Sequence, residues 1–167
     1  MLSDWVLADS SAFAAIAADP EVIRYIGDGT PWSPERSREF IERQIGLCAT
    51  RGFCLWKLTP KQGGDVIGFC GLQPLPETDD IEIGWWLARA WWGRGLATEA
   101  ARAAVDDGFT RAALTRMVAI AQPANTASIR IMEKLGMRFE RMTQSRGTDV
   151  VMYAINAIAG GSSRHQI

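Results

Sequence analysis

Histidine is almost absent from this chain of 167 residues, since the only one is His165 near the C-terminus. It lies in the stretch AGGSSRHQI, whose glycine and serine content predicts a disordered tail over residues 158–167. Catalysis by a serine–histidine or cysteine–histidine pair, and metal sites built on histidine, therefore have no candidate residues. Any chemistry must depend on carboxylates, hydroxyls, thiols or the backbone.

Cysteines, long apolar runs and excess charge are also scarce. The three cysteines, Cys48, Cys54 and Cys70, lack the paired close spacing of a zinc site, which predicts reduced thiols, a cytoplasmic location and no metal. No apolar run reaches the length of a membrane span, and the N-terminus has no secretory pattern. The formal net charge of -1 provides no basic surface for nucleic acid. We therefore expect neither a membrane nor nucleic acid as a direct partner.

The apolar content of 47% is sufficient for one compact domain, which we place at residues 1–157. Helical periodicity and start signals dominate the first third, where the expected helices are 9–18, 20–26 and 34–51. The period then changes to that of short strands separated by turns, at 53–59, 65–75 and 80–87. The remaining elements are expected to be helix 98–111, strand 116–123, helix 125–135 and a hairpin of 137–145 with 149–156. The predicted class is α+β, a mostly antiparallel sheet with helices on its faces.

The stretch EIGWWLARAWWGRGLATEAARAAVDDGF, residues 82–109, places tryptophan pairs and the loop Gly93-Arg94-Gly95 between a strand and a helix. Backbone amides at a helix N-terminus have no partner inside the helix and lie at the positive end of its dipole, so they bind phosphates. Glycine lets a phosphate approach more closely than a β-carbon permits. A Gly-x-Gly sequence is also typical of a simple tight turn, and both interpretations stay open on this loop alone.

Three motifs resemble those of the GNAT superfamily of N-acetyltransferases. They are GWWL at 84–87, WWGRGLATEA at 91–100 and NTASIRIMEKLGM at 125–137, and DPEVIRYIG near the start extends the resemblance over nearly the whole chain. The motifs are most similar to the branch of ribosomal-protein N-terminal (alanine/serine) acetyltransferases. The resemblance implies a GNAT-like fold, a sheet that is splayed at the coenzyme site, and acetyl-CoA as co-substrate. By resemblance alone, a homodimer is a further expectation.

The resemblance also implies that the glycine loop holds the pyrophosphate of acetyl-CoA through backbone amides. The matching residues are Trp92, Gly93, Arg94, Gly95, Leu96 and Ala97, with Thr98 opening the helix. Trp92 departs from the general superfamily pattern but is similar to this branch. The preceding strand, which includes Trp86 and Leu87, would pair with the pantetheine arm through its backbone and diverge from the next strand.

Glu82 is the candidate general base, acting through a water, because it lies on the strand expected beside the thioester. Alternation places it with Gly84 and Trp86 on one face, opposite to Ile83 and Leu87. The competing interpretation is a solvated carboxylate on an alternating strand. At pH 7 roughly a tenth of a terminal α-amine is unprotonated, against less than about a thousandth of a lysine-like amine. An N-terminal amine would therefore need only a modest base.

In the helix that follows Asn125, the residues Ser128, Met132 and Leu135 share its face, and the resemblance places that face against the coenzyme. Many GNAT enzymes have a tyrosine at the Met132 position that protonates the leaving thiolate, which methionine cannot do. The resemblance implies that Ser128 hydrogen-bonds the sulfur instead, although serine is also common at helix starts. The cations Arg130 and Lys134, like Arg94, would either meet a coenzyme phosphate or lie in solvent.

The expected function is acetyl-CoA-dependent N-acetylation of a primary amine by direct transfer in a ternary complex. A protein or peptide N-terminal α-amine is the first expected acceptor, and a small amine such as a polyamine or aminoglycoside is the second. The rival from another class is a catalytically silent acyl-CoA binding module, favoured by Met132 and by the start of the chain. Related chains have a complete first strand before LSDWVLADSSAF, so here that strand is shortened or the true start lies upstream.

Overall fold

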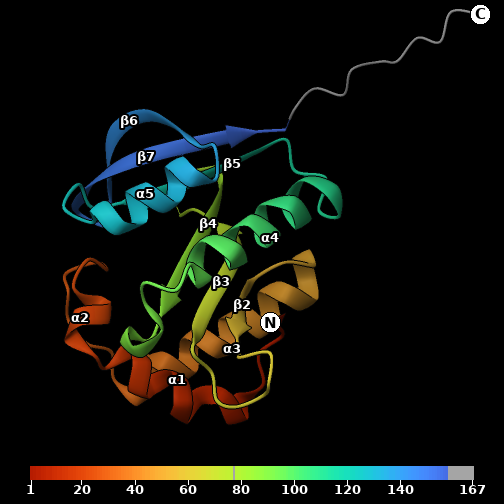
Figure 1. The fold of residues 1–167 in the computed structure, drawn as a ribbon, viewed down its shortest axis with the longest axis vertical. Helices are drawn as coiled ribbons and strands as arrows, with labels where there is room; N and C mark the ends of the chain where they lie inside the picture. The colour runs from red at the N-terminus through yellow and green to blue at the C-terminus, as the bar shows by residue number, and fades with distance from the viewer. Residues whose placement is uncertain (77, 158–167) are drawn as a thin grey trace, which may run out of the picture.

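The structure is a computed structural model, and it describes residues 1–76 and 78–157. Within these residues, seven strands form one sheet in the order β1-β2-β3-β4-β5-β7-β6, with helices packed on it (Figure 1). Neighbouring strands are antiparallel except for β4 and β5, which run parallel. The predicted α+β class is confirmed. The predicted disordered tail, residues 158–167, lies outside the described residues.

The elements follow the predicted order along the chain. The strands are β1 Leu2–Ser3, β2 Leu55–Leu58, β3 Gly68–Pro74, β4 Ile81–Leu87, β5 Arg116–Ala121, β6 Arg138–Ser145 and β7 Thr148–Asn156. The helices are η1 Leu7–Asp9, α1 Ser10–Ala17, α2 Pro20–Ile23, α3 Pro34–Arg51, η2 Arg89–Trp91, α4 Leu96–Thr110 and α5 Thr126–Lys134. No helix among these combines the length and the apolar character needed to cross a membrane.

Capping residues explain where the helices begin and end. The Ser33 hydroxyl accepts a hydrogen bond from the Arg36 amide at 3.2 Å, and Gly52 ends α3 with a φ of +73°. The Asp19 carboxylate likewise accepts from the Glu21 amide at 3.0 Å at the start of α2. Helix α4 begins at Leu96 instead of the predicted Thr98, because Gly95 in the left-handed region forms the turn directly before it.

Two hydrophobic cores lie on opposite faces of the sheet. Helix α4 packs on β3 and β4, and its Ala101 and Ala104 join Ile83 and Leu87 in one core (Figure 1). Helices α1 and α3 form the second core on the other face, which includes Phe69 of β3. Trp86 packs against this second core, so the predicted alternation along β4 is confirmed.

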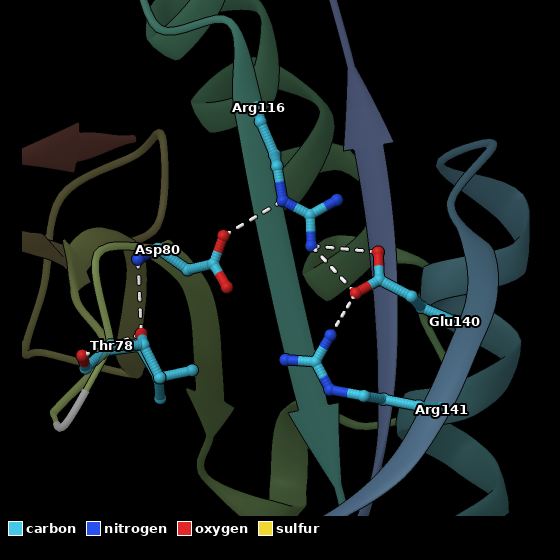
Figure 2. A network of polar contacts seen from close by, with 6 residues as sticks. Thr78, Asp80, Arg116, Glu140 and Arg141 are labelled. Carbon is cyan, nitrogen blue, oxygen red and sulfur yellow. Dashed lines mark hydrogen bonds and ion pairs between the residues drawn. The ribbon is translucent and has the colours of Figure 1, made fainter.

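Strands β4 and β5 pair at one position only, Glu82 with Val118. Beyond this pair the two strands diverge, and the splay that the resemblance implied is confirmed. Figure 2 shows an ion-pair network at the paired end, in which Arg116 Nε donates to Asp80 Oδ1 at 2.9 Å. Arg116 Nη2 also donates to Glu140 Oε1 at 3.0 Å, and Arg141 contacts the same carboxylate. The network therefore links the residue directly before β4 to β5 and β6, near the point where β4 and β5 diverge.

Candidate active site

A pocket of about 460 Å³ lies between the end of β4, the glycine loop and α5. Its lining includes most of the residues predicted to hold the coenzyme: Trp86, Leu87, Trp92, Gly93, Gly95, Leu96, Ala97, Thr98, Asn125, Ser128 and Lys134. Arg94 and Arg130 are not among the lining residues. Residues from the first third of the chain, including Tyr25 and Ile26 just after α2, form the opposite wall.

The glycine loop has both properties that a phosphate site requires. Gly93 and Gly95 have φ angles of +72° and +77°, a left-handed conformation that favours glycine. A β-carbon added at either residue would meet no protein atom within 4 Å, so the space beside the loop is open. In the described chain, no backbone amide from Gly93 to Thr98 donates a hydrogen bond to another protein group. These amides lie at the positive end of α4, which fits a pyrophosphate.

Tryptophans brace the loop against the sheet. The Trp92 indole nitrogen donates to the Leu87 carbonyl at 2.7 Å, although 47% of the residue remains exposed. The Arg94 guanidinium lies over the Trp91 ring, 4.9 Å from its centroid. The indoles thus stabilise a loop whose glycines leave its inner side open.

Helix α5 presents part of the predicted face to the pocket, with Asn125 and Ser128 in the lining but not Met132 or Leu135. Asn125 caps the helix, since its side chain accepts from the Ser128 amide at 3.2 Å. Ser128, Ile131 and Lys134 line the pocket, whereas Met132 is only 1% exposed and packs in the core. The Met132 side chain packs in the apolar core beneath α5, and Ile131 and Lys134, on the neighbouring side of the helix, line the pocket instead.

A second pocket of about 150 Å³ adjoins the first. The two pockets share the lining residues Tyr25, Ile26, Trp85 and Trp86. The remaining wall combines α3, β3, β4, the end of β5 and the β6–β7 turn. Gln122 Nε2 donates to the Gly27 carbonyl at 3.1 Å and so holds the segment after α2 against β5. Two adjoining pockets of this kind suit a reaction between two substrates.

Tyr25 was not selected from the sequence, although it stands in the quoted motif DPEVIRYIG. It is one of two tyrosines in the chain and lines both pockets. The Arg24 guanidinium lies 5.3 Å from the centroid of its ring. The signal was therefore present in the motif, but only folding shows that the side chain stands where the pockets meet.

Glu82 lines the second pocket at the point where β4 and β5 diverge. Its carboxylate accepts a hydrogen bond from Gln73 Nε2 at 3.0 Å, across the β3–β4 pair. Burial raises the pKa of Glu82, while the Gln73 hydrogen bond and the charge of Arg146 oppose that rise. A carboxylate with a raised pKa is a better proton acceptor near neutral pH than an exposed one.

A cluster of possible metal ligands lies outside both pockets. Ligand atoms of Asp4, Cys48 and Cys54 are within 4.8 Å of one another, and Cys48 Sγ donates to Asp4 Oδ1 at 3.2 Å. Burial raises the pKa of both thiols, which disfavours the thiolate that binds metals. Sequence spacing could not indicate this cluster, because Asp4 meets the cysteines only through folding.

Comparison with known proteins identifies the family. The model described as "Acetyltransferase (GNAT) domain" matches residues 1–138. The chain belongs to the GNAT acetyltransferase family. This GNAT protein is 32% identical over 146 residues to the uncharacterized protein YkkB of Bacillus subtilis (strain 168), across 86% of this chain and 84% of YkkB. It is 31% identical over 157 residues to the uncharacterized N-acetyltransferase p20 of Bacillus licheniformis, across 89% and 88% of the two chains.

Solved structures agree with this assignment. A GNAT-family acetyltransferase from Bacillus anthracis has a TM-score of 0.78 and 27% identity, with 93% of each chain covered. The GNAT fold is also shared, at 18% identity, by the ribosomal L7/L12 α-N-protein acetyltransferase RimL and by the aminoglycoside acetyltransferase AAC(6')-Ib, both solved with coenzyme A. The GNAT protein described here is thus an N-acetyltransferase that uses acetyl-CoA.

Proposed function

We propose that this GNAT enzyme transfers the acetyl group to the α-amine at a protein or peptide N-terminus. The observation that carries the proposal is the pair of adjoining pockets, one beside the glycine loop and one lined by Glu82. A single half-buried carboxyl group is a modest base. It suits an α-amine, which is roughly a tenth unprotonated at pH 7, better than a lysine-like amine.

In this proposal the first pocket holds acetyl-CoA, which supplies the acetyl thioester. The amides from Gly93 to Thr98 bind the pyrophosphate. Strand β4 has no ladder partner on its β5 side after Glu82 within the described chain, so the backbone around Trp86 and Leu87 is free to pair with the pantetheine amides. Lys134 meets the 3'-phosphate from the pocket wall, and Arg94 and Arg130 add positive charge nearby.

Glu82 and Ser128 carry the proton chemistry of the proposed reaction. A bond forms between the amine nitrogen and the acetyl carbon, and the carbon–sulfur bond breaks. Glu82 takes the proton of the nitrogen through a water, and the thiolate leaves while Ser128 donates a hydrogen bond to its sulfur. The proton held by Glu82 then returns through water to the thiolate, so that coenzyme A leaves as the thiol and Glu82 is again ionised. Transfer is direct, since Cys48, Cys54 and Cys70 line neither of these pockets.

A small amine is the second candidate acceptor. Distant relatives of the same fold act on different amines, because RimL is described as a protein acetyltransferase and AAC(6')-Ib as an aminoglycoside acetyltransferase. At 18% identity neither decides the acceptor. The motif resemblance supports membership of the ribosomal-protein branch and a homodimer as further parts of the proposal. The unpaired cysteines support a cytoplasmic location.

The acceptor class is tested by measuring release of the coenzyme A thiol with a panel of amines. The panel contains peptides with a free N-terminus, the same peptides with a blocked N-terminus and an internal lysine, a polyamine and an aminoglycoside. We expect the highest kcat/KM with free N-termini. A higher kcat/KM with the polyamine or the aminoglycoside would instead assign the small-amine function.

A further inference from the structure

The second pocket has an unusual charge balance for an enzyme that acetylates amines. Its lining contains two cationic side chains, Arg43 from α3 and Arg146 from the β6–β7 turn. The one acidic residue in the lining is Glu82. Two arginines and one carboxyl group leave a positive pocket even when Glu82 is ionised, and a more positive one after it takes up a proton.

Neither arginine forms an ion pair with another residue that the structure describes. Other arginines in the chain form close ion pairs, such as Arg38 with Glu42 at 2.9 Å and Arg116 with Asp80 at 2.9 Å. Among residues 1–76 and 78–157, Arg43 and Arg146 have no carboxylate within ion-pair distance. The Arg43 guanidinium instead lies over the Phe40 ring, 5.5 Å from its centroid, at the aromatic wall of the pocket.

The two arginines and Glu82 surround a common space. Partial burial and the charge of Arg146 lower the pKa of Arg43, and Arg36 adds to this effect, whereas the Glu39 carboxylate on the same helix opposes it. The charge of Arg146 also lowers the pKa of Glu82 against the effect of burial. All three residues line the second pocket, although they come from different elements.

The backbone at Arg146 supports a role other than turn formation. Arg146 has a φ of +51° and is followed by Gly147 at +76°, so both residues of the tight hairpin are left-handed. Asparagine, aspartate and glycine are the usual residues at such positions. A long cationic side chain has no advantage for the turn itself, but from this turn it lines the pocket.

We propose that the acceptor is a primary amine that carries a carboxylate close to the reacting nitrogen, and that Arg43 and Arg146 bind this carboxylate. The inference rests on the proposed function, in which Glu82 receives the proton of the amine. Arginine suits the task because its planar guanidinium pairs with a carboxylate through two parallel hydrogen bonds. A polyamine or an aminoglycoside would place several cations against two arginines, with one carboxyl group to offset them.

Two sources can supply this carboxylate, and paired acceptors distinguish them. The first pair is Ser-Glu-Ala-Ala and Ser-Gln-Ala-Ala, both amidated at the C-terminus, and the second is free serine and serinamide. We expect kcat/KM to be about tenfold or more higher for the acidic member of one pair, mainly through a lower KM. Preference in the peptide pair assigns an acidic side chain near the N-terminus, and preference in the serine pair assigns the α-carboxylate.

Variants connect that preference to the two arginines. In Arg43→Gln and in Arg146→Asn, the ratio between acidic and amide acceptors should fall toward one, and asparagine preserves the left-handed turn. Arg38→Gln is the matched control, because Arg38 lies on α3 but outside both pockets and should leave the ratio unchanged. Equal kcat/KM for both members of each pair, or ratios that neither pocket variant alters, would overturn the inference.

The inference and the proposed function fail in different ways. If peptides with a free N-terminus are the best acceptors but the acidic and amide members of each pair have equal kcat/KM, the proposed function stands and the carboxylate subsite is wrong. If spermidine is the best acceptor, acetyl transfer stands, but the N-terminal acceptor and the carboxylate subsite are both wrong. If no amine is acetylated, the proposed function is wrong, and the subsite is tested alone by calorimetry on the complex of the protein with coenzyme A. The ligands are the N-acetylated forms of the two peptides, compared with each other, and N-acetylserine compared with its amide. Tighter binding of the acidic member of either pair, lost in Arg146→Asn, supports the subsite, and equal affinity within both pairs overturns it.

Discussion

Replacing Gly95 by alanine separates the two roles of the glycine loop. At a φ of +77° an L-residue costs about 1–2 kcal/mol of stability. The added β-carbon meets no protein atom within 4 Å, so no packing clash increases that cost. If the loop were only a tight turn, this loss of stability would be the whole effect of Gly95→Ala.

If the loop binds pyrophosphate, the added methyl group also displaces the ligand from the amides at the start of α4. Loss of one charge-assisted hydrogen bond, about 1.5–3 kcal/mol, corresponds to about a 10- to 100-fold rise in Kd for coenzyme A. At a coenzyme concentration 100 times the wild-type Kd, bound ligand stabilises the wild type by about 2.7 kcal/mol. A 100-fold weaker variant would gain only about 0.4 kcal/mol under the same conditions.

Gly136→Ala is the matched control for this experiment. Gly136 has a φ of +80° and equally open surroundings, but it lies after α5 and does not line the pocket. Both variants should therefore lose similar stability without ligand in thermal denaturation, whereas only Gly95→Ala should lose affinity in calorimetry. If Gly95→Ala binds coenzyme A as tightly as Gly136→Ala does, the assignment of the loop to the pyrophosphate is refuted.

Three other variants test separate parts of the account. Because burial raises the pKa of Glu82, ionised Glu82 destabilises the folded state above that pKa, and the effect disappears below the usual carboxyl pKa. Glu82→Gln should accordingly raise Tm at pH 7 but not near pH 4, and an equal Tm at pH 7 would contradict this. Ser128→Ala should lower kcat about 10- to 100-fold, because the hydrogen bond to the leaving sulfur is lost. The Kd of acetyl-CoA should not change, since the Ser128 backbone amide still donates to Asn125. An unchanged kcat would exclude Ser128 from the reaction. Arg116→Gln should lower the free energy of unfolding, measured by urea denaturation, by about 1–2 kcal/mol, because the ion pairs of Arg116 with Asp80 and Glu140 are partly buried. An unchanged free energy of unfolding would show that the network does not stabilise the fold.

Local signals in the sequence predicted most of the fold. Ser33 and Pro34 marked the start of α3 and Gly52 its end, because capping depends on neighbouring residues alone. The alternation of Glu82 and Ile83 across β4 was equally local. The motif resemblance added the splay between β4 and β5, which no propensity in either strand could indicate.

The second pocket could not be predicted from local sequence signals, because its walls come from distant parts of the chain. The sequence did not indicate that Arg146, a turn residue, would line a pocket, or that Gln73 would donate a hydrogen bond to Glu82. Helical spacing grouped Met132 with Ser128 on one face, and the resemblance placed that face against the coenzyme, yet Met132 is buried in the core beneath α5.

The central claim is that acetyl passes directly from acetyl-CoA to an amine beside Glu82. The most direct measurement compares thiol release by the wild type and by Glu82→Gln, with acetyl-CoA binding measured on the same samples and Glu133→Gln as a control on the exposed side of α5. The account predicts turnover by the wild type and the control, and at least about a 100-fold lower kcat in Glu82→Gln with unchanged binding. Equal turnover by Glu82→Gln would contradict the role of Glu82, and tight binding without thiol release in the wild type would indicate a silent acyl-CoA binding module.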